Sequence, residues 1–220
     1  MFTLIATVVL PLAIILAQLA AGVTGAIGYS AYKIAFLLLP LIYCRLHGIS
    51  VRRDVLKLQN WRRGLKWTLA LGLLAILIFW GAYFALGDLL LDRSKIVAKI
   101  GTQFSVNSRT VFVIAPITIV LNSLLEEFFY RGFAFGLLVQ RNRAVGYVLP
   151  AVVFTVQHVL FIYDWMGWVP FAMAVAGLFV FAVVLERMYA ETETLVAPWI
   201  IHVFGDVAMM GIAVTMLFAP

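Results

Sequence analysis

Long apolar runs, separated by short polar segments, extend along almost the whole chain. Several of them approach the ~20 residues that an α-helix needs to cross a bilayer. We predict helices at residues 4–22, 30–44, 67–86, 111–139, 147–163, 168–186 and 196–217. Residues 88–104 mix charges with apolar positions, which favours an amphipathic helix at the membrane surface. The pattern predicts an all-α, polytopic transmembrane helical bundle with about seven spans, in a range of about six to eight.

Composition supports the same class of protein. Hydrophobic residues make up 65% of the 220 positions, whereas soluble globular domains contain about 45–50%. The formal net charge is +6, but its basic residues concentrate in loops between apolar runs, so it does not indicate nucleic-acid binding. The partner we expect is the lipid bilayer. Cys44 is the single cysteine of the chain and excludes an intramolecular disulfide.

The basic residues also predict an orientation. The loop at residues 45–66 holds seven Lys and Arg residues against the single acid Asp54. Short loops of this kind stay in the cytoplasm, and counting spans puts the loops near Arg141 and after residue 186 on the same side. We expect a multi-pass protein of a prokaryotic plasma membrane. Lys33, in the short second helix, is expected to extend its ammonium group towards the interface.

Ionisable residues inside predicted spans are few and sit at similar depths. Each costs roughly 2.5–3.5 kcal/mol on insertion scales, and such residues are functional by default. Measured along helices at ~1.5 Å per residue, they lie between ~9 and ~20 Å from the cytoplasmic ends. At one depth they can solvate each other in a shared cavity. They are Glu126, Glu127, Arg131, His158, His202 and Asp206.

The spacing of these residues indicates different roles for the two adjacent glutamates. Glu127 and Arg131 are four apart, with the glutamate first, which favours an ion pair along a helix. Glu126 points about 100° away, so no i+4 cation claims its carboxylate. Peptide hydrolysis in a membrane needs water, a base and a group that stabilises the oxyanion. Glu126 is the predicted base, and His202 and Asp206 share one helical face.

Three motifs appear in order in separate predicted helices: "EEFFYR" at 126–131, "FTVQH" at 154–158 and "HVFGD" at 202–206. This arrangement resembles the CPBP family of intramembrane proteases, which includes the type II CAAX prenyl endopeptidases. The resemblance covers roughly residues 111–217. It implies a catalytic bundle at 111–220, preceded at 1–110 by further helices, the basic loop and the interfacial helix. It also implies a polar cavity open to the cytosol.

The resemblance implies an intramembrane glutamic-type endopeptidase without a cofactor, which acts on a membrane-anchored or lipidated peptide. Glu126 would be the general base, and His158 would bind or activate water. His202 and the residue four positions later would stabilise the oxyanion. The family typically has Asn at that later position, where this chain has Asp206. The implied catalytic set is Glu126, Glu127, Arg131, His158, His202 and Asp206.

Asp206 leaves two roles open. An ionised aspartate cannot donate a hydrogen bond to an oxyanion. Asp206 therefore either donates directly as a protonated acid, or accepts the ring N–H of His202 and orients that ring. We expect the direct-donor role, because the family places an amide there.

Other functions remain open from the sequence. Glu126, His158, His202 and Asp206 could instead hold zinc in an intramembrane metalloprotease, although the consensus spacing H-E-x-x-H is absent. The same groups could relay protons in a proton-coupled transporter. A membrane scaffold without catalytic activity is the third alternative, since Asp206 departs from the usual pattern.

Overall fold

The computed structural model describes residues 2–20 and 25–218, and all regular elements within these ranges are helices. In chain order they are α1 (Phe2–Ala20), α2 (Ala26–Tyr32), α3 (Ala35–Leu46), the short turns η1 (Val51–Val55) and η2 (Leu58–Asn60), α4 (Leu65–Leu90), α5 (Arg93–Phe104), α6 (Val111–Pro116), η3 (Ile117–Asn122), α7 (Ser123–Glu127), η4 (Phe128–Phe135), α8 (Gly136–Leu138), α9 (Arg143–Ile162), α10 (Trp168–Thr192) and α11 (Val196–Phe218).

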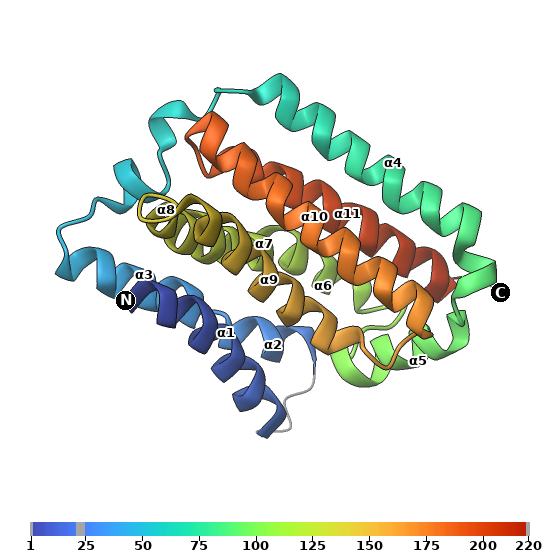
Figure 1. Ribbon diagram of the computed structural model, residues 1–220. Coiled ribbons are helices and arrows are strands. Elements are labelled where there is room, and N and C mark those ends of the chain that lie inside the picture. Colours follow the sequence, from blue (N-terminus) through green and yellow to red (C-terminus); the bar gives the residue numbers. More distant parts are fainter. Residues whose placement is uncertain (1, 21–24, 219–220) are drawn as a thin grey trace.

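Five helices in the described residues are long and apolar enough to cross a membrane. They are α4, the composite helix Val111–Leu138 that runs from α6 to α8, α9, α10 and α11. The N-terminal α1 is a shorter apolar helix. Multiple spans of this kind make the chain an integral membrane protein. The long helices lie alongside one another, with α4 at one edge of the bundle against α11 (Figure 1).

The N-terminal part differs from the predicted spans. The helix expected at 4–22 is α1, which ends at Ala20, and residues 21–22 lie outside the described ranges. The helix expected at 30–44 is two short helices, α2 and α3, because the chain leaves the helical path at Lys33 and Ile34. Neither piece has the length of a span. Hydropathy alone could not find this break, since the segment is apolar on both sides of it.

The amphipathic helix expected at 88–104 is present as α5. Its first residues differ, since 88–90 belong to α4. Asp92 caps α5 by accepting the backbone N–H of Lys95 at 3.0 Å. Ile96 and Ile100 bury one face of the helix, as the four-residue spacing predicts.

The composite helix 111–138 contains two π-helical segments. Pro116 lacks a backbone N–H, and the first π-helical segment, η3, begins directly after it. The second, η4, carries the aromatic run after Glu127, and all eight of its residues are buried. Insertions of this type often mark functional sites. The two segments flank the five residues of α7, which carry both glutamates.

The three predicted cytoplasmic segments meet at one end of the bundle (Figure 1). The Tyr189 hydroxyl donates to the Val55 carbonyl at 2.8 Å, and the Leu195 N–H donates to the Leu56 carbonyl at 3.0 Å. These bonds tie the basic loop to the last turns of α10 and to the turn between α10 and α11. The turn between α8 and α9 lies at the same end, as the counted spans require.

Candidate active site

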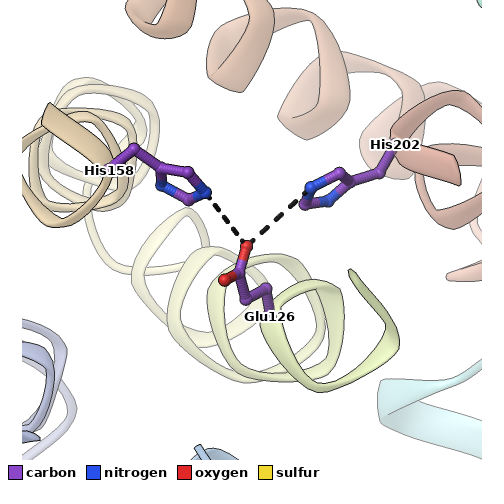
Figure 2. Close-up of side chains that lie close together, drawn as sticks. All are labelled: Glu126, His158 and His202. Carbon is purple, nitrogen blue, oxygen red and sulfur yellow. Dashed lines mark ion pairs between the residues drawn. The ribbon is translucent and has the colours of Figure 1, made fainter. Parts of the chain in front are cut away.

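Glu126, His158 and His202 converge from three different helices, α7, α9 and α11 (Figure 2). One oxygen of Glu126, Oε2, faces both imidazole rings. His158 Nε2 lies 3.3 Å from Oε2, and His202 Nε2 lies 3.8 Å from it. The Glu126 side chain is fully buried, whereas 27% of the His158 side chain is exposed.

Glu127 performs a different task from its neighbour. Its Oε1 accepts from Arg131 Nη1 at 3.0 Å, as the i,i+4 spacing predicts. The same oxygen lies 2.7 Å from His202 Nδ1. Glu127 and Arg131 are fully buried, and Arg131 Nη2 also donates to the Ala182 carbonyl at 3.3 Å. Glu127 therefore links the composite helix to α11, and Arg131 links it to α10.

The partners of the two Nδ1 atoms define the tautomers of both histidines. His158 Nδ1 lies 2.8 Å from the Phe154 carbonyl, which can only accept, so Nδ1 carries the proton. His202 Nδ1 faces the Glu127 carboxylate and donates in the same way. In the neutral rings both Nε2 atoms then offer a lone pair next to Glu126 Oε2. Three acceptor atoms facing one point require a shared proton donor, such as water, or a cation.

Asp206 shares a helical face with His202, as the spacing predicts, but does not receive its Nδ1 proton. The distance from His202 Nε2 to Asp206 Oδ1 is 3.8 Å, which is beyond hydrogen-bonding range. The carboxylate that orients His202 is Glu127. Asp206 Oδ2 is buried and has no hydrogen-bond partner among the described residues. The Asp206 carboxyl therefore remains available to a bound molecule.

The donor set allows a test of the zinc alternative. One ligand atom each from Glu126, His158 and His202 lies within 4.8 Å of the others, which suits a catalytic zinc with three protein ligands. Asp206, the fourth predicted ligand, is not part of this group within the described ranges. The residues fit a three-ligand site, and the second oxygen of Glu126 already faces a cation, Lys33.

Lys33 and Asn122 are site residues that sequence reasoning missed. Lys33 was expected to reach the interface, but it is buried and forms an ion pair with Glu126 Oε1. The spacing along its own helix predicts no cation for Glu126. In the structure its carboxylate nevertheless pairs with Lys33. Asn122 Nδ2 donates to the same oxygen at 3.2 Å. The signal for Lys33 was its position as the only charge in an apolar run, but its partner is 93 residues away.

Glu186 is a further buried carboxyl that the sequence did not single out. It coincides with the predicted end of the helix 168–186, whereas α10 continues to Thr192 and buries it completely. It lies one turn after Ala182, whose carbonyl binds Arg131. Within the described part of the chain, neither of its carboxyl oxygens has a hydrogen-bond partner.

Comparison with known proteins identifies the central part of the chain. A family model described as type II CAAX prenyl endopeptidase Rce1-like matches residues 108–208. Searches of the curated proteins and of the solved structures gave no match. The matched region contains Glu126, Glu127, Arg131, His158, His202 and Asp206. Residues 108–208 thus form a domain of the Rce1-like type II CAAX prenyl endopeptidase family, a protease family, within a chain that has several membrane-spanning helices.

Proposed function

We propose that the protein is an intramembrane endopeptidase that hydrolyses a peptide bond of a membrane-anchored or lipidated substrate with water activated by Glu126. The observation that carries this proposal is that Glu126 Oε2 faces the Nε2 atoms of both His158 and His202. A water molecule at this point can donate one proton to Oε2 and the other to His158 Nε2. Its lone pair is then free to attack a carbonyl carbon.

The reaction runs in two steps. In the first, a water O–H bond breaks, its proton moves to Glu126 Oε2, and the oxygen bonds to the carbonyl carbon. In the second, the C–N bond breaks, and Glu126 returns the proton to the leaving amine. The products are a carboxylic acid and an amine, and the acid then loses its proton to solvent. Burial of Glu126 strengthens each electrostatic interaction in the site, because bulk water is excluded.

His202 and Asp206 are the proposed donors to the oxyanion. His202 already gives its Nδ1 proton to Glu127, so it must carry a second proton on Nε2 to act as a donor. The carboxylates of Glu126 and Glu127 lie beside the ring and balance this charge. Asp206 would donate directly from its protonated form. We further propose that the site opens to the cytosolic side through the partly exposed side chains of His158 and Asp206.

The test is cleavage of a defined substrate by the purified protein in liposomes. Two peptides of one sequence are compared, one prenylated near its C-terminus and one held by a transmembrane helix, and the products are identified by mass spectrometry. Cleavage of either one by the wild type, and of neither by Glu126→Gln, supports the proposal. A wild-type protein that cleaves neither favours the transporter or scaffold alternatives.

A zinc-dependent form of the same hydrolysis is the second candidate, supported by the three convergent ligand atoms of Glu126, His158 and His202. These residues would hold the ion, and zinc supplies Lewis acidity and a more acidic bound water. Glu127 would then keep His202 in the tautomer that offers Nε2 as ligand. Sensitivity to chelators separates this candidate from the metal-free one.

A further inference from the structure

Lys33 occupies a break in the N-terminal helices. The Lys33 N–H donates to the Ser30 carbonyl at 3.1 Å, and the Ile34 N–H donates to the Ala31 carbonyl at 3.2 Å, as in a tight turn. The helical path resumes at Ala35. Lys33 is 9% exposed, whereas the adjacent Ile34 is 48% exposed. The turn therefore directs the ammonium group into the protein and the apolar neighbour outwards.

The Lys33 ammonium forms its ion pair with Oε1 of Glu126. Asn122, one turn before Glu126 on the composite helix, donates to the same oxygen at 3.2 Å. The other oxygen, Oε2, carries neither contact and is the one that faces His158 and His202. The two carboxylate oxygens are thus distinguished, with one held by two donors and one directed at the imidazoles.

This distinction has a consequence for the proposed chemistry. The last side-chain torsion of a glutamate has a broad distribution. A carboxylate without fixed partners therefore rotates, and either oxygen can face a given point. Proton abstraction requires one oxygen within hydrogen-bond reach of the water. Two donors on Oε1 restrict this rotation. They also compensate a carboxylate that is completely buried, which otherwise carries a large desolvation cost.

We propose that Lys33 is a positioning residue for Glu126, and that the α2–α3 turn completes an active site whose other members belong to the family domain. Lys33 lies outside the matched residues 108–208, so this contribution is added by the N-terminal segment. The inference deepens the proposed hydrolysis and rests on it for its catalytic consequence. A purely structural ion pair would bury the same charges without setting the orientation of Oε2.

The first experiment measures turnover in liposomes for Lys33→Ala, with and without added alkylamines. A positioning role predicts that kcat falls by about 10–100-fold while KM changes little. Ethylammonium or propylammonium, which can occupy the vacated space, should restore part of the lost kcat. Lys99→Ala is the matched control, because Lys99 forms an ion pair with Asp164 at partly exposed positions away from the site. Amines should change neither that variant nor Glu126→Gln.

The second experiment needs no activity and therefore separates this inference from the proposed function. Melting temperatures of Glu126→Gln, His158→Ala and the double variant give the coupling between these two residues. The same cycle is repeated with Lys33→Met. If Lys33 orients Glu126, the coupling is at least halved in the Lys33→Met background. An unchanged coupling overturns the inference, as does a kcat for folded Lys33→Ala equal to the wild type. If the coupling between Glu126 and His158 is lost in the Lys33→Met background and the wild type cleaves no peptide, Lys33 still positions Glu126. That result contradicts only the proposed peptide hydrolysis.

Discussion

The Nδ1 atom of His202 lies 2.7 Å from Oε1 of Glu127, the same oxygen that binds the Arg131 guanidinium. One carboxylate thus joins a cation on its own helix to an imidazole on α11. This leaves the adjacent Glu126 to face the other nitrogen of the ring. Two consecutive glutamates therefore point to different partners. Glu127 binds Arg131 and His202. Glu126 is directed at the Nε2 atoms of His158 and His202.

Replacing Glu127 with Gln should damage both stability and activity. The Gln carbonyl can still accept from His202, but it no longer neutralises the fully buried Arg131. Breaking a buried ion pair by removing one partner costs about 3–5 kcal/mol. Loss of the orienting carboxylate should lower kcat by about 10–100-fold. Thermal unfolding and turnover of the purified variant measure the two effects.

Glu186→Gln is the matched control for that variant. It also removes a fully buried carboxyl group near Arg131, but from a residue whose oxygens lack hydrogen-bond partners in the described ranges. We expect a much smaller loss of stability and near wild-type turnover. If Glu186→Gln proves as harmful as Glu127→Gln, the assignment of Glu127 as the partner that stabilises Arg131 is wrong.

The direct-donor role of Asp206 predicts unequal effects of two substitutions. Asn keeps a donor of nearly the same shape, so Asp206→Asn should retain most of the activity. Ala removes the donor and should lower kcat by about 10²–10³-fold, as loss of one oxyanion donor does. Turnover of both variants at neutral pH provides the comparison. Equal and severe losses would mean that the carboxylate itself, and not a donor, is needed at this position.

The sequence predicted which motif residues meet in the site, but it did not predict all of the contacts that they make there. Three motifs on separate apolar runs, at similar depth, correctly indicated that Glu126, His158 and His202 meet. The pairing of Glu127 with Arg131 followed from helical spacing and is confirmed. The contact between Glu127 and His202 joins residues 75 positions apart, and no local pattern encodes it.

The errors in the fold have local physical causes. The break at Lys33 lies within a continuous apolar run, so hydropathy predicted one helix where two short ones form. The buried ammonium could not be foreseen because its compensating carboxylate lies on another helix. Similarly, Glu186 lies where the apolar pattern fades, at the predicted end of a span, although α10 continues beyond it. A long-range ion pair accounts for the burial of Lys33, and hydropathy reports only local preference.

Packing of α4 on α11 predicts a contrast between two glycines of α4. A Cβ atom added at Gly72 would lie 2.8 Å from the ring of Phe204, whereas one at Gly81 would meet nothing within 4 Å. Overpacking of this kind costs about 1–3 kcal/mol. Gly72→Ala should therefore lower the melting temperature, and Gly81→Ala should leave it unchanged or slightly raised. Similar melting temperatures for the two variants would contradict the close approach of α4 to α11.

The metal-free mechanism predicts that a strong chelator leaves turnover unchanged. Lys33 already supplies a cation to Glu126, and in this mechanism Oε2 of Glu126 takes the proton of the attacking water without a metal. Elemental analysis of the purified protein should give less than one zinc per chain. Loss of activity on chelation, with recovery on adding Zn²⁺ alone, would establish the three convergent residues as zinc ligands instead.

The most direct test of the account is the turnover of Glu126→Gln in liposomes, beside the wild type and on a substrate that the wild type cleaves. Gln keeps the size of the side chain and an oxygen for Lys33 and Asn122, but it cannot accept a proton from water. We predict a folded, inserted protein whose cleavage rate falls by at least ~10², the lower end for losing a general base. Turnover of this variant at the wild-type rate would contradict the central claim that Glu126 activates water.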